Sequence, residues 1–179
     1  AATPSKTKAI NQKLRKAIES EGRVARIEGL WWQFALTART HEPSAVSLIR
    51  ISRDRDGALE LRGRAWQEDG SLSARYWSEA VKERKESPGV FYYWKGERPL
   101  DPNAPQLDGT GEIRMESAER ASGYFTTHAD THARASSRTA GVYWRADPGD
   151  MDILDGGDDQ KRAELIAERL RHWKSIKTA

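Results

Sequence analysis

The segment LELRGRAW, residues 59–66, has the clearest alternation of small or apolar with polar side chains in this chain. Successive side chains of an extended strand point to opposite faces, so two sets separate. One face carries Leu59, Leu61, Gly63 and Ala65. The other face carries Glu60, Arg62, Arg64 and Trp66. The sequences DRDG (54–57) and EDGS (68–71) on either side are typical of turns, so the segment predicts a single strand between two turns.

Seven further strand-length runs lie between Gly29 and Arg145, separated by Gly, Pro, Asp and Ser. They are 31–34, 46–51, 76–81, 90–94, 109–115, 123–127 and 141–145. Short strands at this spacing, with turn residues between them, indicate a β-sandwich or a closed barrel. We predict a mainly β fold, an antiparallel up-and-down β-barrel of about eight strands with flanking N- and C-terminal helices.

The two ends of the chain have helical patterns. Ile10, Leu14, Ala17 and Ile18 follow the spacing of an amphipathic helix. Near the C-terminus, Asp158 is placed to cap a final helix whose apolar residues are Leu165, Ile166, Leu170 and Trp173. We therefore expect a lead-in helix in 1–28, a β-barrel ligand-binding domain in 29–147, and a linker and C-terminal helix in 148–179.

Composition limits the classes of function. The 179 residues suit one domain, and seven Trp and five Tyr are too many large side chains for a disordered chain. A net charge of +3, from 30 basic and 27 acidic residues, argues against a DNA or RNA polymer as partner. The absence of cysteine excludes disulfides, thiol catalysis and Cys-ligated zinc.

No stretch approaches the roughly 20 consecutive apolar residues of a membrane-spanning helix. The chain begins at Ala1 without an initiator Met. Methionine removal, cleavage of a signal peptide and separation from a membrane anchor are all compatible with this start.

The sequence has no arrangement of residues typical of catalysis. Gly109-Thr110-Gly111 lacks the Lys-Ser/Thr of a P-loop and opens a strand, which indicates a close backbone approach. His128 and His132 lie in a segment typical of a loop, without a third metal ligand. We therefore expect a protein that is not an enzyme and that has no cofactor and no metal site.

Aromatic residues and arginines are interleaved on the predicted strands, a combination that can hold a nucleotide. Aromatic rings stack on bases and guanidinium groups pair with phosphates. The candidates for stacking are Trp66, Tyr76, Tyr93, Tyr124 and Tyr143. The candidates for phosphate are Arg64, Arg114 and Arg145, and Thr126 could read a base edge. For each residue alone, a place in the core or on the solvated surface is the competing interpretation.

The order of these elements resembles a known family. The matching segments are 29–32, 59–66, 69–70 followed by 76–78, 91–94, 109–111, 123–125 and 143–145. Together they resemble the eight-stranded, lipocalin-like β-barrel of the membrane-anchored effectors in bacterial CBASS anti-phage defence. The resemblance implies two transmembrane helices before the barrel, binding of a cyclic dinucleotide by the barrel, and oligomerisation that disrupts the inner membrane. We therefore expect a cytoplasmic domain, anchored to the bacterial inner membrane only through a segment outside this chain, with a periplasmic location as the alternative.

The leading expectation is thus a barrel that binds a nucleotide second messenger, a cyclic di- or oligonucleotide, and self-associates when the ligand is bound. The alternative is a lipocalin-like carrier of a small molecule or lipid. A hydrolase or isomerase on a similar barrel would need an acid–base pair that the sequence does not reveal. A purely structural interaction domain would bind no small molecule at all.

Overall fold

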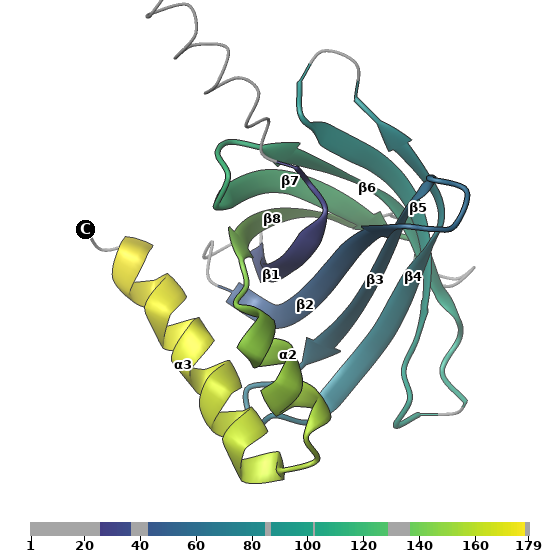
Figure 1. Cartoon of the computed structure of the whole chain (residues 1–179). Helices are drawn as coiled ribbons and strands as arrows, with labels where there is room; N and C mark the ends of the chain where they lie inside the picture. The colour runs from purple at the N-terminus through teal and green to yellow at the C-terminus, as the bar shows by residue number, and fades with distance from the viewer. Residues whose placement is uncertain (1–25, 37–42, 85–86, 102, 129–136, 178–179) are drawn as a thin grey trace, which may run out of the picture.

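The computed structural model describes residues 26–36, 43–84, 87–101, 103–128 and 137–177. These residues form a closed antiparallel β-barrel of eight strands, in which each strand pairs with its neighbours in sequence and β1 pairs with β8 (Figure 1). The predicted fold class, a mainly β up-and-down barrel, is therefore confirmed. The helix expected around 10–18 lies outside the described residues.

Each predicted run lies within one strand of the barrel. The strands are β1 (Gly29–Leu36), β2 (Pro43–Arg53), β3 (Leu59–Trp66), β4 (Leu72–Glu83), β5 (Gly89–Glu97), β6 (Leu107–Met115), β7 (Arg120–Thr127) and β8 (Ser137–Arg145). The predicted turn before β3 is held by Asp54, whose carboxylate accepts hydrogen bonds from the backbone N–H of Asp56 and of Ala58. The backbone of Gly57 is left-handed there, with φ of 82°, which favours glycine.

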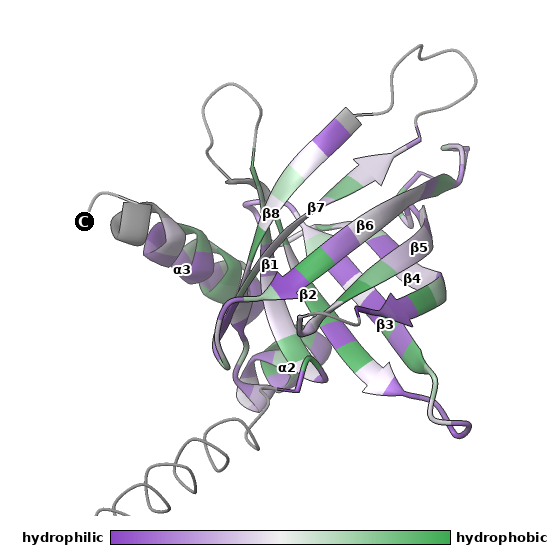
Figure 2. Ribbon diagram, turned by 90° about the horizontal axis from the view of Figure 1, so that it is seen from above, coloured by the Kyte–Doolittle hydropathy of each residue, from purple (hydrophilic) through white to green (hydrophobic). Residues whose placement is uncertain are grey.

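The barrel interior is filled at one end, which we call the packed end. Its core includes Ile27, Trp31, Ile51 and Leu61, and the indole of Trp31 donates a hydrogen bond to the Ile27 carbonyl. The face of β3 that carries Leu59, Leu61, Gly63 and Ala65 points inward, which the alternation alone could not decide. Figure 2 shows hydrophobic and hydrophilic residues following one another along the strands.

Two strand glycines make room for interior tyrosines. Gly63 on β3 is opposite Tyr76 on β4, and a Cβ at Gly63 would lie 2.1 Å from Cζ of that ring. Gly111 on β6 has the same relation to Tyr92 on β5, at 2.3 Å. Each ring therefore covers a glycine on the next strand and occupies the volume that a side chain there would need.

A second core lies on the outside of the barrel, beneath two helices. Helices α2 (Pro148–Asp155) and α3 (Asp159–Lys177) lie along one side of the barrel wall (Figure 1). Phe34 on β1 stacks on Trp173 of α3, with ring centroids 5.5 Å apart. Asp158 caps α3 by accepting a hydrogen bond from the Lys161 backbone N–H, as the sequence predicted.

The segment expected as a linker contains helix α2. Asp147 caps it by accepting from the Gly149 backbone N–H, and Pro148 is its first residue. Inside α2, the buried Asp150 accepts from the Trp32 indole at 2.7 Å and from the Arg169 guanidinium at 2.8 Å. This carboxylate therefore ties both helices to β1. No helix within the described ranges combines the length and apolar character needed to span a bilayer.

Candidate functional site

The other end of the barrel interior, which we call the mouth, contains a hollow of about 210 Å³. It lies where β1, β3 and β7 end and where β4 and β6 begin. Small and aromatic side chains line it, among them Ala35, Ala65, Ala74, Tyr76, Trp94 and Phe125. The alanines leave the space, and the rings form apolar walls around it.

A hydrogen-bonded group of polar side chains lies in the interior beside the hollow. Gln33 donates to the Tyr143 hydroxyl at 2.9 Å and accepts from the Tyr76 hydroxyl at 3.1 Å. Burial raises the pKa of Tyr143 to about 12 and also raises the pKa of Tyr76 and of Tyr92. The hydroxyls are therefore protonated at neutral pH and act as hydrogen-bonding groups.

Trp94 has an indole N–H that is buried and makes no hydrogen bond to any described residue. Its ring lines the hollow and lies edge-on to Tyr76 and Phe125, with centroids 6.0 and 6.4 Å away. A buried donor without an acceptor is costly. The N–H lies beside β6, 2.9 Å from where a Cβ at Gly109 would be, so the wall of the mouth contains a donor without an acceptor among the described residues.

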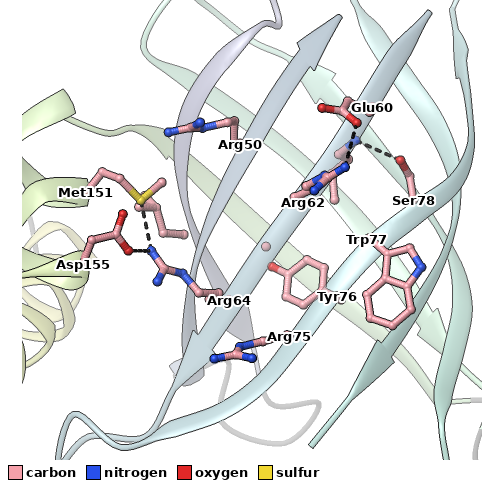
Figure 3. Close-up of a pocket in the computed structure, with 13 residues that line it drawn as sticks. Arg50, Glu60, Arg62, Arg64, Arg75, Tyr76, Trp77, Ser78, Met151 and Asp155 are labelled. Carbon is pink, nitrogen blue, oxygen red and sulfur yellow. Dashed lines mark hydrogen bonds and ion pairs between the residues drawn. The ribbon is translucent and has the colours of Figure 1, made fainter. Parts of the chain in front are cut away.

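A second, larger hollow of about 610 Å³ lies on the outer wall, over β2, β3 and β4 and beside α2 (Figure 3). We call it the arginine groove. The charged and aromatic residues that define it are Arg50, Glu60, Arg62, Arg64, Arg75, Trp77 and Asp155. Arg64 forms an ion pair with Asp155 of α2 at 2.7 Å, and Arg62 a longer one with Glu60 at 3.4 Å.

The structure separates the nine residues expected to bind a nucleotide. Tyr76 and Tyr143 lie inside the barrel on either side of Gln33. Arg64 lies in the arginine groove, with its guanidinium 5.3 Å from the Trp66 ring centroid. Trp66 itself is buried in the outer core, packed against Trp32, and does not face a hollow.

Four of the expected residues lie on the outer face of β5, β6 and β7. Tyr93 donates to Asp108, and Thr126 shares a hydrogen bond of 2.9 Å with Thr110. Arg138 covers the Tyr124 ring at 3.8 Å. Arg114 forms an ion pair of 2.8 Å with the buried Glu112. These side chains are engaged with one another or with their neighbours on the wall.

Arg145 lies at the packed end, far along β8 from the mouth. It donates to the backbone carbonyls of Arg26, Glu28 and Ala118, and its guanidinium is 3.7 Å from the Trp31 ring centroid. Burial lowers the pKa of this guanidinium. Each guanidinium nitrogen donates to a backbone carbonyl, so Arg145 holds the packed end together and has a structural role.

The nine residues therefore do not form one site. Alternation along a strand separates two faces but does not say which face is the interior. The sequence prediction missed Arg50, Arg75 and Trp77, which complete the arginine groove. One part of the groove was visible in the sequence, because Arg62 and Arg64 lie on the same face of the strand 59–66. The registers of β2 and β4 beside it were needed to find the rest.

No known protein family and no curated protein matches this sequence. The resemblance to the barrel of CBASS effectors therefore stays a prediction.

Proposed function

We propose that this chain is a small-molecule-binding barrel whose ligand occupies the mouth. The observation that carries the proposal is the difference between the two ends of the interior. Eight strands enclose a space just wide enough to be filled by side chains or to hold one small ligand. Here side chains fill the packed end, whereas three alanines leave a hollow of about 210 Å³ at the mouth.

The lining indicates the chemistry of the ligand. The hollow is smaller than the 300–1,000 Å³ of a typical drug-sized site, which favours a compact molecule. Its walls are aromatic, and Arg98 is the one cation among the described lining residues. A mainly apolar or aromatic molecule with one hydrogen-bond acceptor suits these walls better than a ligand with two phosphates.

Nucleotide sensing is the second candidate function, and it rests on a different part of the molecule. Phosphates need several cations, and within the described chain these gather in the arginine groove on the outer wall. Ligand-promoted self-association, a membrane anchor and a role in anti-phage defence remain expectations from the resemblance alone. The carrier-like function in the mouth has the closer structural support.

Filling the hollow tests the proposal. Thermal-shift measurements of the full chain against indoles, phenols, fatty acids and cyclic dinucleotides would first identify a ligand. A bound ligand at a hundredfold excess over its Kd stabilises the fold by about 2.7 kcal/mol, which the assay detects. Ala74→Phe places a ring in the hollow and should abolish that shift.

The matched control is Ala80→Phe, the same change on the same strand at an exposed position. It should leave the ligand-induced shift intact. Equal ligand-induced shifts in Ala74→Phe and in the unsubstituted chain would overturn the mouth as the site.

A further inference from the structure

The arginine groove places like charges directly opposite each other on neighbouring strands. Arg50 on β2 is opposite Arg62 on β3, and Arg64 on β3 is opposite Arg75 on β4. Like charges in directly opposite positions of an antiparallel pair destabilise the sheet. Two such pairs side by side on one wall therefore need a source of negative charge.

The carboxylates of the groove offset only part of the positive charge of its arginines. Asp155 pairs with Arg64 and Glu60 pairs with Arg62, and both carboxylates line the groove. Within the described residues, Arg50 and Arg75 are exposed and form no ion pair, although Glu97 is opposite Arg75 on β5. The described lining residues thus carry a net charge of +2.

An aromatic ring lies in the same row as two of these arginines. Trp77 on β4 is opposite Arg62, which is itself opposite Arg50. The indole N–H of Trp77 donates to Glu79 at 2.9 Å, which restrains the ring on the outer wall. Trp77 and these arginines are among the residues that line the groove, drawn in Figure 3. A planar group can stack on the indole while anionic groups reach the arginines.

We propose that the arginine groove binds a small phosphate-bearing molecule with a planar ring. Its phosphates pair with Arg50, Arg62 and Arg75, and its ring stacks on Trp77. Arginine pairs with phosphate through two parallel hydrogen bonds, and the ligand's charge relieves the repulsion between opposite arginines. The volume of about 610 Å³ suits a nucleotide, and the groove lies on the outer wall rather than in the interior, although Tyr76 lines both hollows.

Calorimetry on the full chain tests this site, with ADP and pyrophosphate as the probes. Both should bind, more weakly as salt rises, because the contacts are charge–charge interactions. Arg50→Gln combined with Arg75→Gln should weaken the binding of both probes at least about tenfold. The double variant should keep the melting temperature, since it removes charge repulsion and breaks no ion pair among the described residues.

The matched control replaces two exposed arginines elsewhere, Arg55→Gln with Arg171→Gln, and should leave both affinities nearly unchanged. Trp77→Ala should weaken ADP binding while pyrophosphate binding persists. Ala74→Phe, which fills the mouth, should affect neither probe. The proposal is overturned by a wild-type chain that binds neither probe, by equal losses in the two double variants, or by unchanged ADP affinity in Trp77→Ala.

Discussion

At the packed end, the guanidinium of Arg145 illustrates how one residue type serves two kinds of contact. From sequence, Arg145 is a candidate for phosphate because arginines and aromatic residues are interleaved on the predicted strands. In the structure it donates instead to the carbonyls of Arg26, Glu28 and Ala118 and lies over Trp31. Phosphates and backbone carbonyls both accept hydrogen bonds from arginine. The residue type alone could not separate these roles.

Arg145→Ala should therefore destabilise the fold. The change removes hydrogen bonds from a charged donor to three carbonyls and its contact with an aromatic ring. We expect the free energy of unfolding to fall by about 2–4 kcal/mol in urea titrations. Arg55→Ala, at an exposed turn position, is the control and should change it little. A loss no larger than that of the control would contradict the structural role.

The interior tyrosine Tyr143 gives a pH prediction. Burial raises its pKa to about 12 in the folded chain, whereas the hydroxyl titrates at the ordinary value of 10.0 when exposed. Below pH 10 the Tyr143 hydroxyl is protonated in both the folded and the unfolded state, and its contribution to stability is fully present. Between about pH 10 and 12 only the unfolded state ionises, so this residue lowers the free energy of unfolding by about 1.4 kcal/mol per pH unit.

Unfolding measured from pH 8 to 12 should reveal this loss, and Tyr143→Phe should make the decline shallower above pH 10. The variant also loses the hydrogen bond from Gln33, so its stability at pH 8 will be lower and the slopes are compared. Identical slopes in the two chains would show that the Tyr143 hydroxyl is not buried.

At the scale of the elements, strand positions could be predicted from sequence because turn residues separate the runs and each run contains apolar or aromatic residues. Helix α2 could not, since Asp-Pro-Gly in 147–149 is typical of a loop and only the cap by Asp147 starts a helix there. The arginine groove could not be predicted either, because it depends on the register between neighbouring strands. Arg64 was identified by residue type, but its opposite position to Arg75 follows from the pairing of β3 with β4.

The packing of Gly63 against Tyr76 gives a prediction about these two strands. Gly63→Ala places a methyl group in the tyrosine ring and should destabilise the fold by about 1–3 kcal/mol. In a Tyr76→Ala background the same change should cost almost nothing, because the opposing ring is gone. Chemical denaturation of the four chains measures this coupling. An equal cost in both backgrounds would contradict the packing.

At the scale of the whole molecule, the barrel has one filled end, one hollow end and a charged groove on its wall. The helices α2 and α3 lie along part of the outer wall (Figure 1). The number of strands followed from sequence, whereas the position of the hollow did not. It depends on which small residues of different strands meet at one level of the interior, and alternation within one strand does not contain that information.

The central claim is that a small molecule binds in the mouth. The most direct test is a nuclear magnetic resonance titration of the ¹⁵N-labelled chain with phenol, whose hydroxyl can accept a hydrogen bond, following the tryptophan side-chain N–H signals. The account predicts a shift of the Trp94 signal, with Trp77 on the outer wall unchanged. Shifts confined to tryptophans outside the mouth, or no shift of Trp94 at millimolar phenol, would contradict it.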